Sequence, residues 1–116
     1  MVAVLIVNGE PVYHTDDNRI VLYEYLMENY GPFTDIEGWS GYWGEGAISN
    51  ASDLGSCFNV DSGLETCSYK LRDGEGNLID IVVIIAPWYL YSINDPEVKE
   101  AVRNYYLDLG INPDEQ

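Results

Sequence analysis

The distribution of apolar positions predicts a chain that opens with a strand pair. Residues 2–7 form an unbroken apolar run rich in β-branched side chains, which is typical of a buried strand. The Asn8-Gly9 pair that follows is a strong signal for a two-residue turn, and residues 11–13 fit a short returning strand. Because Pro11 donates no backbone hydrogen bond, this second strand is expected at the edge of a sheet.

A first helix is expected over residues 16–30. Its apolar positions recur at helical spacing, at Ile20, Tyr23, Met27 and Tyr30. Thr15 is the expected N-cap, and Asp16 and Asp17 would lie in the first turn, where the helix dipole favours negative charge. Gly31-Pro32 should end the helix, because proline cannot continue it.

A second helix is expected near the C-terminus. Asp95 is a natural N-cap with Pro96 at the first helical position, and the helix should run to about residue 109 and end at Gly110. Residues 111–116 then form a polar, acidic tail, and residues 1–110 form a single domain.

The middle of the chain contains a long aperiodic stretch followed by strands. Residues 31–56 show no clear period, and we expect a short strand near 46–48 within them. Residues 57–60 and 64–71 predict a hairpin, and residues 72–77 a turn. Residues 78–85 (LIDIVVII) are the most β-prone segment and the expected central strand. The pattern predicts an α+β fold, with an antiparallel sheet of about four or five strands and two helices packed on one face.

The chain is long enough for a core and too polar to span a membrane. Its 116 residues are 47% apolar, close to the globular average, so we expect a packed domain. No run of 18 apolar residues occurs, and the first apolar run has no basic segment before it, unlike a signal peptide. We therefore expect a cytoplasmic protein that does not enter membranes.

Charge narrows the set of partners more than any other feature. Twenty Asp and Glu face five Lys and Arg, a formal net charge of −15. Residues 1–69 hold eleven acidic residues against Arg19 alone. Such a field repels nucleic acid and attracts basic partners at rates that fall with salt. Direct binding to DNA or RNA is therefore not expected. The alternative is an ordinary solvated acidic surface.

Two cysteines allow two interpretations. If residues 61–63 form a three-residue hairpin loop, the register places Cys57 opposite Cys67, and a cross-strand disulfide fits that arrangement. The alternative in a cytosolic protein is a pair of reduced thiols. Two cysteines and the distant His14 are too few for a structural zinc site, so no metal is expected.

Catalytic motifs are absent from the sequence. His14 is the single histidine, and no nucleophile elbow, phosphate loop or metalloprotease motif occurs. Residues 73–80 place oxygen ligands at alternate positions, as a calcium loop does, but Leu78 stands where that loop requires glycine. We therefore expect a hairpin turn there, no cofactor and no enzymatic activity.

Acidic and aromatic residues together suggest a binding segment in the glycine-spaced stretch GWSGYWGEG at residues 38–46. Tyr and Trp dominate the energetics of interfaces, and this chain has ten tyrosines and three tryptophans. The residues expected to bind a partner are Asp35, Glu37, Trp39, Tyr42, Trp43, Glu45 and Asp53. Packing of the same aromatic side chains over a sheet face is an equal alternative.

The leading hypothesis is a small inhibitor or adaptor that binds a basic, nucleic-acid-handling protein. Its carboxylates would stand in for phosphates, with aromatic anchors adding affinity that salt does not abolish. Small phage or plasmid proteins that block host nucleases, including anti-restriction and anti-CRISPR proteins, are similar in size and charge, although no motif carries this similarity. The alternatives are a salt-adapted or structural acidic domain, and a small-molecule binding module that uses the aromatic loop.

Overall fold

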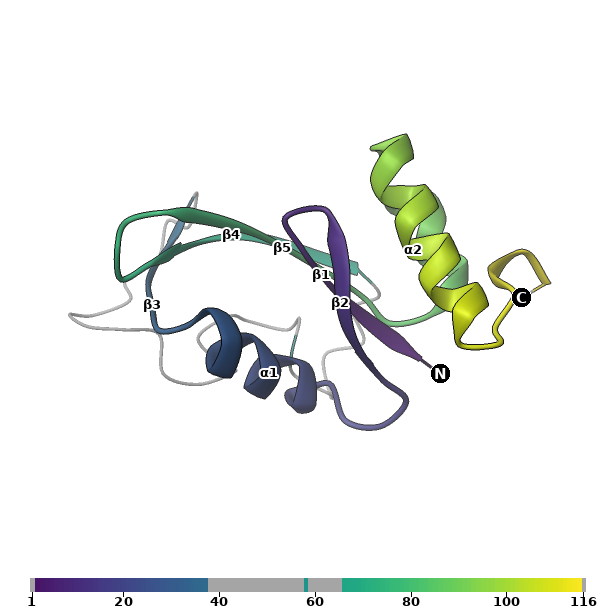
Figure 1. Cartoon of the computed structure of the whole chain (residues 1–116), viewed down its shortest axis with the longest axis horizontal. Coiled ribbons are helices and arrows are strands. Elements are labelled where there is room, and N and C mark those ends of the chain that lie inside the picture. The colour runs from purple at the N-terminus through teal and green to yellow at the C-terminus, as the bar shows by residue number, and fades with distance from the viewer. Residues whose placement is uncertain (1, 38–57, 59–65, 116) are drawn as a thin grey trace.

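Five strands form one antiparallel sheet, in the order β2-β1-β5-β4-β3 (Figure 1). The computed structural model describes residues 2–37, 58 and 66–115. The strands are β1 (Ala3–Val7), β2 (Glu10–Thr15), β3 (Phe33–Glu37), β4 (Thr66–Asp73) and β5 (Leu78–Ile84). The helices are α1 (Ile20–Tyr30) and α2 (Pro96–Asp108), with short 3-10 helices η2 (Pro87–Ser92) and η3 (Pro113–Glu115). The predicted α+β class is confirmed.

Strand β1 is buried along its whole length, and its side chains divide between two cores. Ala3, Leu5 and Val7 belong to one cluster with the buried residues of α1, and Val4 and Ile6 belong to another with those of α2. Successive side chains of a strand point to opposite faces of its sheet. The two clusters therefore lie on opposite faces.

The helices accordingly cover different faces of the sheet, and the expectation that both pack on one face is wrong. Leu22 and Leu26 of α1 join the first cluster, and Val102 and Tyr106 of α2 join the second. Figure 1 shows α1 beneath the sheet and α2 above it, beside the end formed by β1 and β2. The apolar stripe of a helix indicates that one side is buried, but not against which face of the sheet.

Aromatic side chains attach both helices to the edge strand β2. The ring of Tyr13 stacks on that of Tyr25 from α1, with centroids 4.3 Å apart. On the other face, His14 Nδ1 and the Tyr105 hydroxyl of α2 form a 2.7 Å hydrogen bond. His14 thus lies half-buried in a strand, where the sequence suggested a loop between a strand and a helix.

Several local predictions are confirmed. Strand β2 is an edge strand, as Pro11 required, and β5 lies at the centre of the sheet. The turn at Asn8 and Gly9 has positive φ at both residues (51° and 82°), as this type of hairpin turn demands. Helix α2 begins after Asp95, and Gly110 (φ 83°) follows its end.

The start of α1 differs from the prediction. The helix begins at Ile20 rather than at residue 16, because β2 continues to Thr15, which pairs with Ala3. Two side-chain turns then fill the interval: Thr15 Oγ1 accepts from Asp17 N at 3.1 Å, and Asn18 Oδ1 accepts from Ile20 N at 2.9 Å. Such local bonds compete with helix formation.

Three elements were not predicted, namely β3, η2 and η3. Strand β3 lies at the start of the stretch that has no clear period. A register shift between Phe33 and Asp35 interrupts the two-residue alternation of this strand, and its pattern therefore does not indicate a strand. The aromatic run at residues 88–91 forms η2. The strand expected near residues 46–48 lies outside the described residues. So does the first strand of the expected hairpin, at residues 57–60, except for Phe58. Strand β4 confirms most of the second strand of that hairpin, expected at residues 64–71.

The segment expected as a polar tail makes contacts with α2. Ile111 packs against the α2 core, and Pro113 is buried. Asp114 forms an ion pair with Arg103 of α2. Residues 111–114 therefore extend the packed structure past Gly110.

We expect Tyr106→Ala to destabilise the fold by about 3–5 kcal/mol, as other buried aromatic truncations do. The Tyr106 side chain is fully buried, and its hydroxyl donates to the Val2 carbonyl at 2.8 Å. Its neighbour Leu107 is 47% exposed, so Leu107→Ala should change stability by no more than about 0.5 kcal/mol. Urea denaturation of both variants tests this, and similar losses would contradict the assigned face of α2.

We expect Gly9→Ala to cost about 1–2 kcal/mol, the cost of a left-handed conformation in a residue with a Cβ. An added Cβ would also lie 3.2 Å from Val98 Cγ2. Gly74 is the matched control, because a Cβ there meets nothing within 4 Å. Thermal unfolding should show a clear loss for Gly9→Ala and almost none for Gly74→Ala. Equal losses would argue against the tight approach of the turn to α2.

Candidate functional site

The strongest candidate site lies where the β1–β2 turn, β5 and the start of α2 meet. The turn is fixed to β5 by two hydrogen bonds. Asn8 N donates to the Asp80 carbonyl at 2.8 Å, and Asp80 N donates to Asn8 Oδ1 at 2.9 Å. Because the backbone of Asp80 is held on both sides, its position relative to the turn is well defined, while its side chain is exposed.

Asp95 is the second acidic residue of the site, after Asp80. Its Oδ1 accepts from Glu97 N at 2.9 Å and from Val98 N at 3.4 Å, which caps α2. Pro96 at the first helical position fixes the direction of the chain. The capping bonds hold the Asp95 side chain at the helix N-terminus, next to the sheet.

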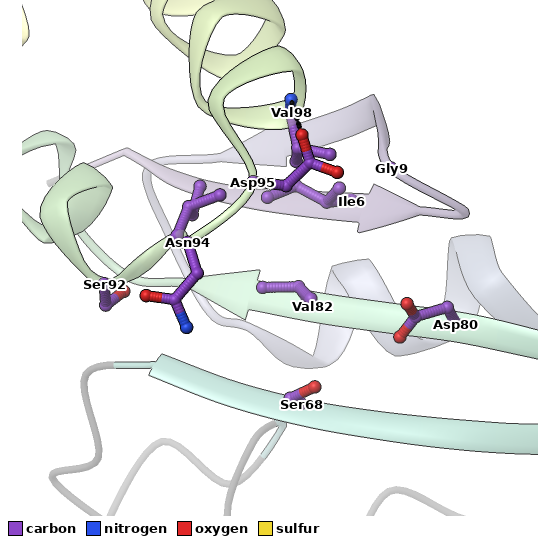
Figure 2. Close-up of a pocket in the computed structure, with 10 residues that line it drawn as sticks. Ile6, Gly9, Ser68, Asp80, Val82, Ser92, Asn94, Asp95 and Val98 are labelled. Carbon is purple, nitrogen blue, oxygen red and sulfur yellow. Dashed lines mark hydrogen bonds between the residues drawn. The ribbon is translucent and has the colours of Figure 1, made fainter.

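Between these two residues lies a hollow of about 330 Å³, which we call the α2 groove (Figure 2). Its apolar lining consists of Ile6, Val82, Ile93 and Val98. Its polar lining includes Ser68, Asp80, Asn94 and Asp95. In Figure 2, Val82 lies between Asn94 and Asp80, and Asp95 lies on the α2 side of the groove. The groove thus combines an apolar surface with carboxylates.

A second hollow of about 500 Å³ shares Gly9, Asp80, Asp95 and Val98 with the α2 groove. Four exposed carboxylates line it, and we call them the acidic corner: Glu10, Asp80, Asp95 and Glu97. They come from three separate places in the chain, since only Asp95 and Glu97 are close in sequence, so no single local motif contains all four. The two hollows together form a negatively charged surface around the β1–β2 turn.

Cations offset this charge only in part. Lys70 lies opposite Asp80 in the β4–β5 ladder. Arg103 is paired with Asp114, and Arg72 donates to the Gly76 carbonyl at 2.8 Å. Arg19 is only 8% exposed, and burial lowers its pKa. The single cation of residues 1–69 is therefore almost absent from the surface.

Three aromatic residues of η2 directly precede the groove residue Ser92 in the sequence. The ring centroids of Trp88 and Tyr89 are 5.8 Å apart, and those of Tyr89 and Tyr91 are 6.2 Å apart. Tyr91 is 73% exposed, and Ser92 immediately after it borders the groove. Sequence analysis expected acidic and aromatic residues together in the segment at 38–46. The same combination occurs at WYLYSINDPE, residues 88–97, where the sequence predicted only the helix start at Asp95 and Pro96.

The expected partner-binding residues are only partly placed by the structure. Asp35 and Glu37 lie on β3, opposite Arg72 and Lys70 in the β3–β4 ladder. The remaining five lie outside the described residues: Trp39, Tyr42, Trp43, Glu45 and Asp53. Their role stays a prediction.

The proposed cysteine pair is also only partly placed. Cys67 lies on β4 opposite Val83, and Cys57 is outside the described residues. The disulfide and the reduced pair therefore both remain open as predictions.

The segment that resembled a calcium loop is a hairpin turn. Asp73 Oδ1 accepts from Glu75 N and from Asn77 N, each at 2.9 Å. These hydrogen bonds, of which the one from Asn77 N has the larger effect, hold the pKa of the Asp73 carboxyl below its usual value. The Asp73 carboxylate thus organises the β4–β5 turn.

Within residues 2–37, 58 and 66–115, no group of three or more His, Cys, Asp or Glu side chains is arranged to hold a metal ion. In the same part of the chain, neither helix is long and apolar enough to cross a membrane. No protein-family model, curated protein or solved structure matches the chain. The functional argument therefore rests on the geometry of the acidic corner and the α2 groove.

We expect Asp95→Ala to destabilise the protein by about 1 kcal/mol through loss of the α2 cap, and Asp95→Asn to do so by no more than about 0.5 kcal/mol, because asparagine caps helices nearly as well. Chemical denaturation of both variants measures the difference. Equal losses would mean that the carboxylate charge, rather than the cap, stabilises the helix start. If the cap dominates, Asp95→Asn removes charge from the corner in a folded protein.

Proposed function

We propose that this chain is a small acidic binding protein whose partner is a basic, nucleic-acid-handling protein. The observation that carries the proposal is the acidic corner: four exposed carboxylates border hollows that also offer apolar surface. The net charge of −15 favours rapid encounter with a basic surface, and local contacts then select the partner. Tyr91, which directly precedes Ser92 of the groove lining, is an exposed aromatic of the kind that dominates interface energetics.

Inhibition follows from competition for one surface. A protein that handles nucleic acid carries Lys and Arg where phosphates bind. Carboxylates presented by a folded domain accept charge-assisted hydrogen bonds from the same side chains. Occupation of that surface by the acidic corner would exclude the nucleic acid, which is the mechanism of a DNA mimic. An anti-defence inhibitor, of the anti-restriction or anti-CRISPR kind, is the biological setting that we propose.

We expect the immobilised protein to retain a basic, nucleic-acid-binding protein from host lysate at about 0.05 M salt and to release it at about 0.5 M. Duplex DNA should also release it, because the two compete for one surface. Neutralising the corner (Glu10→Gln, Asp80→Asn, Asp95→Asn and Glu97→Gln together) should weaken retention about tenfold, a loss of about 1.4 kcal/mol. Mass spectrometry identifies the retained protein and titration measures its affinity.

The matched control neutralises four exposed acids away from the corner: Asp16→Asn, Asp17→Asn, Glu24→Gln and Glu28→Gln. It removes the same charge and should retain the partner nearly as well. Equal weakening by both sets would show that net charge alone acts, which contradicts a defined surface. Retention that duplex DNA does not reverse would contradict mimicry. Loss of structure at low salt would favour the salt-adapted alternative, since self-repulsion would then govern folding.

A further inference from the structure

We propose that the α2 groove binds a single lysine side chain of the basic partner. This inference rests on the proposed function and names the chemistry that the site recognises. The carrying observation is the hollow itself, about 330 Å³ with an apolar lining from Ile6, Val82 and Val98. Its volume is at the lower end of the range for small-molecule pockets, which suits one extended side chain.

The lining matches the two parts of a lysine side chain. The methylene stem would cover Val82 and Val98, which are half-buried, and apolar contact of this kind is how long basic side chains pack while their charged end stays in a polar setting. Asp80 lies to one side of Val82 and Asn94 to the other (Figure 2). The ammonium would therefore meet the Asp80 carboxylate at one end of the groove and the side-chain amide oxygen of Asn94 at the other, with Asp95 on the α2 side.

The arrangement of acceptors favours lysine over arginine. An ammonium is a compact charge with three donors that can point at separate acceptors, whereas a guanidinium prefers one carboxylate facing it in its own plane. The groove offers separate acceptors from β5 and from the start of α2, in Asp80 and in Asp95 with its neighbour Asn94. One oxygen of Asp95 already accepts the capping bonds, which reduces its capacity for a two-pronged contact.

Charge complementarity excludes the anionic occupants that a hollow beside a helix N-terminus might otherwise attract. A phosphate or a nucleotide would approach through the field of the acidic corner and of the whole chain, which carries −15. A cation gains from the same field. The groove and the corner share Asp80 and Asp95, so a lysine in the groove would bring its flanking residues over the corner.

The test is amide chemical-shift mapping by NMR with three short peptides that differ at one central residue, lysine, arginine or norleucine, in a glycine background. We expect the lysine peptide to shift the backbone amide signals of residues 80–82, 94, 95, 97 and 98, with a dissociation constant on the order of 1 mM, as suits one side chain. The arginine peptide should bind several-fold more weakly, and the norleucine peptide, which keeps an apolar stem but has no charge, at least tenfold more weakly.

Two variants and one control locate the contact. Asp80→Asn removes the charge of an exposed side chain and should weaken binding of the lysine peptide about fivefold. Val82→Ser should also weaken binding of this peptide, because it reduces the apolar surface of the groove. Glu100→Gln removes the same charge from an exposed position on α2 outside the groove and should change binding less than twofold. Asp80→Asn alone keeps the test decisive if Val82→Ser fails to fold.

Several results would overturn the proposal. These are equal binding of the norleucine peptide, tighter binding of the arginine peptide, or shifts that spread over the acidic surface without a maximum at the groove. Tighter binding of n-butylamine than of the lysine peptide would make a free amine the ligand, and would overturn it also. Capture of a nucleic-acid-binding partner that Asp80→Asn with Val82→Ser leaves unchanged would reject the groove but keep the proposed function. Binding of the lysine peptide at the groove, without capture of a nucleic-acid-binding partner, would keep the groove as a lysine site but reject the proposed function.

Discussion

The burial of β1 on both faces is the constraint on which the rest of the structure depends. Val4, Leu5 and Ile6 are all at most 1% exposed, so this strand has no side toward solvent. An antiparallel sheet can leave one face wet, but a strand with apolar residues at every position cannot. One helix must therefore cover each face of β1, and the chain supplies α1 for one and α2 for the other. The hydrogen bond from Tyr106 to the Val2 carbonyl then joins α2 to the start of the strand.

The candidate site lies where the part of the sheet that α2 covers comes to an end. Helix α2 packs over β1 and the end of β5 through Val102 and Tyr106, whereas the other end of β5 carries the exposed Asp80 and Leu78. Asp95 and Pro96 start the helix at this boundary, so its N-terminus stands above the point where the sheet face changes from apolar to polar. A hollow with apolar and acidic linings is the natural product of such a boundary, and the β1–β2 turn, held by Asn8 to Asp80, closes one side of it.

Features encoded within a few residues could be predicted from the sequence, and features that depend on distant segments could not. The continuous apolar runs of β1 and β5, the Asn8-Gly9 turn and the Asp95-Pro96 helix start are local signals, and all four occur in the structure. The face that each helix covers is a property of the whole topology, and there the expectation failed. The acidic corner is of the same kind, because Glu10 meets Asp80, Asp95 and Glu97 only after the sheet has formed and α2 has packed on it. Segment 38–46 attracted attention because its aromatic and acidic residues are adjacent in sequence, whereas Glu10 and Asp80 join Asp95 and Glu97 only in the folded chain.

Charge and shape make separable contributions at this site. The long-range field of twenty acidic residues acts on any basic surface and weakens within about 10 Å at ordinary salt, so it can speed encounter but cannot choose a partner. Choice has to come from contacts at short range, and the α2 groove is where apolar surface and fixed carboxylates occur together. A surface of carboxylates alone would be satisfied by any counter-ion. A surface that also presents Val82 and Val98 favours a cation that brings its own apolar stem, which is a property of basic side chains and not of simple ions.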